Sequence, residues 1–455
     1  MSLARACATT SFTTSPVAVR DRVVDLVADT VAVTALGSAR PELVALVEES
    51  AVGAPEGGAT VIGSVHGWPA GTAAFLNASA VAADQLQDGH RMARGHPASH
   101  VVPAVLALAE ERDMPGDEVL SAVLAGYEVG TRVGRAMGGT TPGVHDIGTW
   151  GAVAVAAAVA RLLRPGDVAV SEATIGLAAS AVLLTDAATI FGGRTGGHAF
   201  LGASVQLGLS LGTSAVAGLA PLPGALERHL AAVAAKGFDP AALEVGDSWV
   251  DLEVLRGYVK THPTCAHLHG LNDAVADLLA AGSPDGGPLR AEDVADVEVR
   301  LFHAAAAFDA VARDELTARF SAPTSVAVAL VTGQLDETTV TTGTVTSPAV
   351  TDLASRVRVV HDETLDTAYP QGRPARVLVR LRDGRELTAR GDRPRGDDDR
   401  ALPREELRAK ARRLLTHRFG GEHATGVLTA IDDLATDGTA RDLGLALRVA
   451  AEATP

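Results

Sequence analysis

The sequence is poor in aromatic residues, sulfur and lysine. Aromatic residues make up 3% of the 455 positions, there are two cysteines (Cys7 and Cys265), and there are three lysines. Two cysteines cannot ligate a conventional four-cysteine iron–sulfur cluster, and they cannot form a disulfide framework. Apolar residues still reach 47%, so the core must be built from alanine, valine and leucine. Such a core suits closely packed helices.

Basic charge and long apolar runs are also scarce. The net charge is −16, which argues against nucleic acid and anionic membranes as partners, because both select for basic surfaces. No apolar run approaches the roughly 18 residues of a membrane span. Met1 to Pro16 has no apolar core of a signal peptide. We therefore expect a cytoplasmic protein, and any anionic substrate would need a local positive pocket.

The first half of the chain has the apolar spacing of successive helices. The expected helices are Val17–Leu36, Gly71–Ala83, Pro103–Glu111, Glu118–Gly130, Ala152–Leu163, Val168–Leu184 and Gly202–Leu219. Pro103 is interpreted as a first-turn proline. Most of these segments are apolar on all sides, which indicates central helices.

The pattern changes near Val250. Alternating apolar residues predict strands at Asp293–Phe302, Arg356–Val360, Arg376–Leu381 and Arg385–Ala389, the last two joined by the hairpin signature Asp383-Gly384. Helices are expected at Pro263–Ala281 and Ala322–Leu330, and helical spacing returns from Pro403. The predicted fold is mainly α with a smaller α+β domain. Residues 1–255 and 401–455 would form one all-helical domain, and residues 256–400 an inserted α+β lid domain.

Lys260 lies in the densest cluster of reactive side chains. A lysine kept in such an arginine-rich chain indicates a need for a compact, titratable ammonium group. His262, Cys265, His267 and His269 follow it, but their spacing fits no zinc finger and there is no HExxH motif. We therefore interpret Lys260 and a histidine of this segment as serving an acid substrate, and the four residues mostly as the start of a helix with local structural roles.

Three further clusters are candidates for chemistry. Residues 88–100 combine histidines, arginines and an aspartate that could bind carboxylates and move protons, although a polar loop before a helix would look similar. His145 stands before an alanine-rich helix, where a histidine is either a cap or functional. The loop Gly192–Gly197 has Arg194 and is followed by His198. It could hold an anion, but it lacks the order of a phosphate-binding loop.

In combination these motifs resemble the MmgE/PrpD family, which includes 2-methylcitrate dehydratase and cis-aconitate decarboxylase. The resemblance rests on Gly95-His96-Pro97, Leu124-Ala-Gly-Tyr-Glu-Val129, Gly148-Thr-Trp-Gly151, Lys260-Thr-His-Pro263 and Phe320-Ser-Ala-Pro323. It implies a homodimer, a pocket between two domains, and lyase chemistry without cofactor or metal. The matching catalytic positions are His96, His145 and Lys260.

The chain departs from the family pattern at two places. The family commonly has a double aspartate followed by threonine where this chain has Gln87-Asp88-Gly89-His90. A second family lysine falls near Gly192–His198, where Arg194 or His198 would be its substitute. These departures leave the substrate open.

The expected mechanism is proton removal next to a carboxylate, which needs a positioned base and cations to stabilise the developing charge. Lys260 and either Arg194 or Arg91 would hold carboxylates, while His96 and His145 act as base and acid. The predicted substrate-binding residues are Asp88, His90, Arg91, Arg194, His198 and His262. Dehydration of the 2-methylcitrate type is the preferred reaction, with decarboxylation or epimerisation of a related acid as the alternative. A metal-dependent hydrolase and a non-catalytic binding protein are more remote possibilities.

Overall fold

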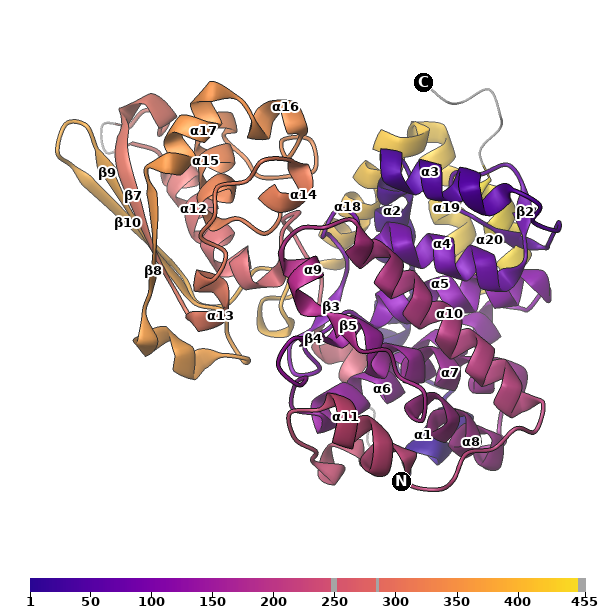
Figure 1. Cartoon of the computed structure of the whole chain (residues 1–455). Helices are drawn as coiled ribbons and strands as arrows, with labels where there is room; N and C mark the ends of the chain where they lie inside the picture. The colour runs from indigo at the N-terminus through magenta and orange to yellow at the C-terminus, as the bar shows by residue number, and fades with distance from the viewer. Residues whose placement is uncertain (247–251, 284–285, 449–455) are drawn as a thin grey trace.

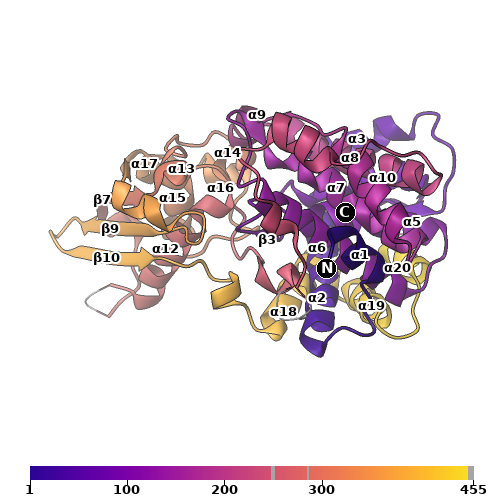
Figure 2. The same ribbon diagram turned by 90° about the horizontal axis from the view of Figure 1, so that it is seen from below.

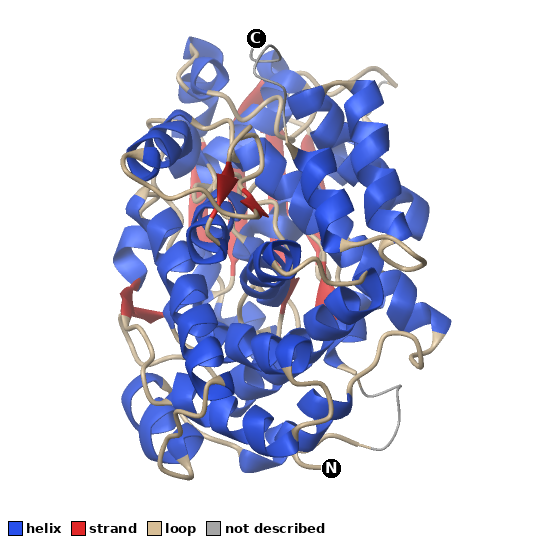
Figure 3. Ribbon diagram, turned by 90° about the vertical axis from the view of Figure 1, so that its right-hand side faces the viewer, coloured by secondary structure: helices blue, strands red, loops and turns tan. Residues whose placement is uncertain are grey.

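The computed structural model describes residues 1–246, 252–283 and 286–448. Helix is the dominant structure, as Figure 3 shows with helices in blue and strands in red. Figure 1 shows two lobes: a larger helical one, and a smaller one that combines helices with a sheet. The predicted fold class, mainly α with a smaller α+β part, is confirmed. The residue boundaries of the two predicted domains stay a prediction.

The helical lobe is built around α7 (Trp150–Leu163), which is buried from Trp150 to Leu162. Its alanine-rich surface lets α5, α6, α8 and α10 approach closely. The helices of this lobe from the first part of the chain are α1 (Leu3–Thr9), α2 (Val17–Gly37), α3 (Pro41–Ala51), α4 (Ala70–Val81), α5 (Pro97–Glu111), α6 (Gly116–Ala136), α7, α8 (Val168–Ala179), α9 (Ala187–Phe191), α10 (Gly196–Val216) and α11 (Ala232–Ala234).

The C-terminal segment completes the same lobe. It forms α18 (Arg404–Phe419), α19 (Gly421–Asp433) and α20 (Ala440–Leu447). In Figure 1 these yellow helices lie beside the indigo N-terminal ones, with α18 packed on α2 and α20 on α5. A buried ion pair, 2.7 Å from Lys410 Nζ to Asp29 Oδ1, joins α18 to α2.

The smaller lobe contains a four-stranded sheet in the order β10-β9-β7-β8. Strand β7 (Val294–Leu301) pairs parallel with β8 (Val357–His361) and antiparallel with β9 (Ala375–Leu381), which pairs with β10 (Glu386–Gly391). The hairpin β9–β10 turns at Gly384, whose φ of 90° suits glycine, and it extends to the far end of the lobe in Figure 2. The helices here are α12 (His269–Ala281), α13 (His303–Ala306), α14 (Glu315–Ala318), α15 (Ala322–Thr332), α16 (Thr342–Val345) and α17 (Pro348–Ser355).

Short strand pairs hold together the segments that build the site. β3 (Gly89–His90) pairs with β6 (Gly257–Tyr258), and β4 (Val144–His145) pairs with β5 (Thr185–Asp186). A third pair, β1 (Ala59–Thr60) with β2 (Gly67–Trp68), lies elsewhere in the helical lobe. The first pair joins two segments about 170 residues apart in the sequence, so the segment before Lys260 lies next to the one before His96.

Several expected element boundaries were wrong. Helix α5 begins at Pro97, so Pro103 lies inside it. Helix α8 ends at Ala179, because Thr185 and Asp186 pair with β4. Helix α12 begins at His269, after a 3-10 turn. In each case the helix itself was correctly placed, and only one of its ends was predicted wrongly.

Two helical segments are long and apolar enough to cross a membrane by length and composition alone. They are Asp146–Leu163, 89% buried within the protein, and Gly196–Val216, 44% buried; the bent pair α2–α3 would count as a third if it is one span. The expectation that no segment approaches this length was therefore wrong, because glycine, serine and threonine between apolar residues hid the pattern. The expectation that the protein has no membrane partner stays a prediction.

Candidate active site

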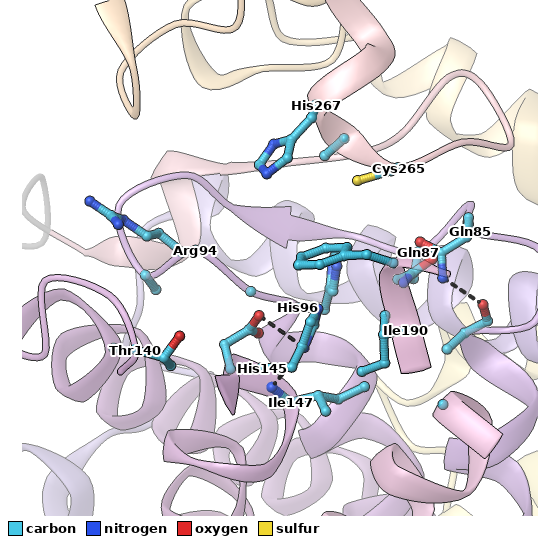
Figure 4. A pocket seen from close by; sticks show the side chains of 18 of the residues that line it. Gln85, Gln87, Arg94, His96, Thr140, His145, Ile147, Ile190, Cys265 and His267 are labelled. Carbon is cyan, nitrogen blue, oxygen red and sulfur yellow. Dashed lines mark hydrogen bonds and ion pairs between the residues drawn. The ribbon is translucent and has the colours of Figure 1, made fainter. Parts of the chain in front are cut away.

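A cavity of about 220 Å³ lies between the two lobes. Figure 4 shows Cys265 and His267 on one side of it, facing His145, Ile147 and Thr140 on the other. Polar and aromatic lining residues include Gln85, Gln87, Arg94, His96, His145, Asp146, Arg194 and His198 from the helical lobe, and Tyr258, Cys265, His267, Phe320, Tyr369 and Arg373 from the smaller lobe. Both lobes are therefore needed to form the site.

The cavity has an excess of positive charge. Arg94, Arg194 and Arg373 line it, and none of them has an ion-pair partner among the described residues. The Nε atoms of Arg94 and Arg373 are buried with no hydrogen-bond partner in that part of the chain. Asp146 is the only carboxylate among the described lining residues, and burial raises its pKa. In a protein of net charge −16, this is the local positive pocket that an anionic substrate needs.

His96 is held as a proton acceptor. It is the N-cap residue of α5, and its Nδ1 contacts the backbone carbonyl of Asp88, which can only accept. The hydrogen of the neutral ring is therefore on Nδ1, and Nε2 has a free lone pair. Burial, with a contribution from the charge of Lys260, lowers the pKa of His96 well below its usual value. His96 is thus neutral at physiological pH and suited to act as a base.

His145 is held in the opposite tautomer. The backbone N–H of Ile147 donates to its Nδ1 at 3.2 Å, so the hydrogen of the neutral ring is on Nε2. Asp146 Oδ1 also lies 3.2 Å from Nδ1, and it could accept a hydrogen bond from that atom only if Nδ1 had a hydrogen. The two contacts belong to different states, because Nδ1 accepts from Ile147 only when it has no hydrogen. In both states Nε2 has a hydrogen, which suits His145 to act as an acid.

His100 ties the two histidine segments together. Its Nδ1 lies 2.9 Å from the backbone oxygen of His96 and its Nε2 lies 3.0 Å from that of Ile147. The ring lies directly on Gly151, where an added Cβ would be 2.1 Å from the ring. Gly95 allows an equally close approach, since a Cβ there would be 2.3 Å from Asp146. The glycines next to these histidines therefore set the distance between them.

Lys260 is fully buried just behind the cavity and does not line it. Its Nζ donates to Gln85 Oε1 at 3.2 Å and to Gln87 Oε1 at 3.4 Å, and both glutamines line the cavity. Burial lowers the pKa of Lys260 to about 7. Lys260 therefore does not face the cavity itself, but it is hydrogen-bonded to two glutamine side chains that do.

Comparison with known proteins identifies the family. The model of the MmgE/PrpD N-terminal domain matches residues 1–228, and the model of the MmgE/PrpD C-terminal domain matches residues 262–435. The chain belongs to the MmgE/PrpD family. It is 26% identical to a cis-aconitate decarboxylase of Aspergillus terreus over 431 residues, which covers 88% of this chain and 85% of that protein. It is also 26% identical to the cis-aconitate decarboxylase-like protein oryM of Aspergillus oryzae, covering 86% and 84%. These matches support a lyase that processes an acid.

In this MmgE/PrpD protein, Arg194 and His198 both line the cavity; that either replaces the second family lysine stays a prediction. Arg194 is exposed at the end of the glycine-rich loop, while His198 lies in the first turn of α10 and is 5% exposed. Burial lowers the pKa of His198, so this side chain is neutral near pH 7. Only Arg194 therefore provides a fixed positive charge there.

Asp88 and His90 do not line the cavity, contrary to their predicted role in substrate binding. Asp88 accepts hydrogen bonds from the backbone of Ala98 and Ser99 and so caps α5. His90 is buried against Glu253, with 3.0 Å between His90 Nε2 and Glu253 Oε2. Both are structural contacts of the segment that holds His96.

Arg91 and His262 are also outside the lining of the cavity. Arg91 pairs with Asp397 and Asp398 of the smaller lobe. His262 Nε2 lies 3.0 Å from Asp273 Oδ1. These pairings with distant residues occupy side chains that looked available in the sequence.

Other lining residues were not predicted. Cys265 and His267, expected to have mostly local structural roles, both line the cavity. Burial lowers the pKa of His267 to about 3, so it is neutral there. Gln87 and Arg373 gave no signal of their own, but the cluster around Lys260 did mark the segment that provides Cys265 and His267.

Among the described residues, no three histidine, cysteine, aspartate or glutamate side chains gather as metal ligands. His262 and His269 are in ring contact, at 5.6 Å between centroids, but His262 is already bonded to Asp273. The described residues thus offer no set of metal ligands that a metal-dependent hydrolase would need.

Proposed function

We propose that the protein is a cofactor-independent lyase that removes a proton next to a carboxylate of a small di- or tricarboxylic acid, most simply a dehydratase of the 2-methylcitrate type. One observation carries this proposal: two histidines with opposite tautomers face a cavity lined by three arginines that have no ion-pair partner among the described residues. The arginines bind carboxylates, and their charge stabilises the enediolate-like intermediate.

The two histidines then divide the proton transfers. His96 Nε2 takes the proton from the carbon next to the carboxylate, and the electron pair of that C–H bond forms the new C=C bond. The hydroxide on the neighbouring carbon leaves with the Nε2 proton of doubly protonated His145, and water is released.

Decarboxylation is the second candidate, and the names of both fungal relatives favour it. In that case carbon dioxide leaves instead of hydroxide, and the carbanion takes its proton from His145. The same residues serve both reactions, so product analysis must separate them.

The test is an activity assay on purified protein with citrate, 2-methylcitrate and cis-aconitate, followed by NMR of the product in D2O. Dehydration yields an unsaturated acid with all its carboxyl groups, whereas decarboxylation yields an acid with one fewer. We expect His96→Ala and His145→Ala each to lower turnover by about 100-fold or more. The exposed His66→Ala is the matched control and should leave turnover unchanged. Wild-type turnover in both cavity variants would refute the assignment.

The remaining expectations stay proposals. They are a homodimer, a cytoplasmic location, and no nucleic acid, membrane or cofactor as partner. Light scattering on the purified protein tests the homodimer, and turnover after dialysis against a chelator tests the independence from metal.

A further inference from the structure

Lys260 lacks the carboxylate partner that a buried ammonium usually has. It is fully buried, and no described carboxylate lies within ion-pair distance of it. The groups that accept from its Nζ are the amide oxygens of Gln85 and Gln87. A buried charge is normally paired, so this arrangement calls for an explanation.

The lysine fixes how the two amides are turned. When Lys260 is protonated, its ammonium group has three donors and no acceptor, so the atom that faces it is the oxygen of each glutamine. The nitrogen of Gln85 then donates to the backbone oxygen of Ala82 at 3.0 Å. The nitrogen of Gln87 donates to no described residue, and it is not among the fully enclosed polar atoms. Gln87 lines the cavity, so its two N–H donors are available to a ligand there.

The charges around these donors favour an anionic acceptor. Arg373 and Lys410 lie near Lys260, as do the neutral Cys265 and the buried Asp88, whose pKa burial raises to about 7. Gln87 is a neutral hydrogen-bond donor that lines the same cavity as His96. A carboxylate fits this position better than a hydroxyl group, because it accepts without having to donate.

We propose that Gln87 is a substrate-binding residue whose Nε2 donates to a carboxylate of the acid, and that Lys260 is a positioning residue that holds the Gln87 amide in this orientation. The inference rests on the proposed function, since it concerns the same cavity. In this arrangement the amide of Gln87 contacts the substrate, and Lys260 does not contact it directly. The substrate is accordingly an acid with one carboxylate over Gln87 and another at the arginines.

Gln87→Glu tests the role of the donor, with Gln85→Glu as the matched control. Both changes give Lys260 a carboxylate partner, but only the first replaces the free donor by an acceptor. With cis-aconitate and propane-1,2,3-tricarboxylate as probes at pH 6.5, we expect Gln87→Glu to raise Kd at least about tenfold more than Gln85→Glu does. Both variants should keep a single cooperative thermal unfolding transition, which shows that they fold. Equal losses of affinity in the two variants would overturn the inference.

A double-mutant cycle tests the positioning role. Gln87→Met removes the donor without adding charge, and Lys260→Met removes the group that orients it. If Lys260 acts through Gln87, Lys260→Met raises KM in the wild-type background and has little further effect in Gln87→Met. Equal effects in both backgrounds would mean that Lys260 acts on its own. Failure of the wild type to bind or turn over any acid would overturn the proposed function, whereas binding that Gln87→Glu and Gln87→Met leave intact overturns the inference alone.

Discussion

The burial of Lys260 should make the stability of the protein depend on pH in a specific window. Burial lowers the pKa of Lys260 from 10.5 to about 7. Between these values the unfolded chain binds the proton and the folded protein does not, so stability rises with pH across the window. Below pH 7 Lys260 is charged in the folded protein, so the folded state bears the full cost of desolvating its ammonium group. Each pH unit corresponds to about 1.4 kcal/mol, so the whole window is worth on the order of 5 kcal/mol.

Urea unfolding at pH 7 and pH 9 measures this effect. The wild type should gain about 2 kcal/mol relative to Lys260→Met between the two pH values, because the folded lysine is still half protonated at pH 7. Lys236→Met is the control, since Lys236 is exposed, and it should follow the wild type. If the difference in unfolding free energy between wild type and Lys260→Met is the same at both pH values, the lysine does not titrate as described and the reasoning fails.

Three further substitutions probe the surroundings of the cavity. Gly151→Ala places a Cβ 2.1 Å from the His100 ring, so we expect a loss of about 1–3 kcal/mol in thermal unfolding and a larger loss of turnover than an alanine elsewhere on α7 causes. Arg319→Met leaves Asp84, buried 2.7 Å from it across the two lobes, with one partner fewer, and should lower the unfolding free energy by about 3–5 kcal/mol; an unchanged melting temperature would contradict this. Arg373→Met removes a cavity cation that has no ion-pair partner among the described residues, so KM for cis-aconitate should rise about tenfold or more with kcat changed less. An unaltered KM would show that the substrate lies elsewhere.

Local sequence patterns were enough to place most of the elements. Val17–Leu36 was expected as a helix and α2 is Val17–Gly37, because its apolar spacing is regular. The hairpin at Asp383-Gly384 was located from the turn residues alone. The predicted start of helix α5 was six residues too late, because Pro97 and Pro103 are both acceptable first-turn residues. The choice between them depends on Asp88, which caps the earlier start from outside the helix.

The site was only partly predictable. His96 and His145 could be selected as residues that match a known family, and both line the cavity. His90 and His262 looked equally reactive, but their partners lie on other elements and cannot be read from the sequence. Gln87 has no charge and no reactive group, so only the geometry of Lys260 reveals its free donors. Sequence patterns therefore located the chemistry better than they located the groups that bind the substrate.

The segment that holds Gln85 and Gln87 depends on a helix that is synthesised long after it. Lys410, on α18, donates to the backbone oxygen of Leu86 at 2.8 Å, and Leu86 lies between Gln85 and Gln87. During translation, the segment that holds these glutamines leaves the ribosome more than 300 residues before its partner does. The ribosome adds about 5–20 residues per second, so the N-terminal helices wait tens of seconds for α18. A nascent chain therefore has every residue that lines the cavity before α18 can support the segment that holds Gln85 and Gln87.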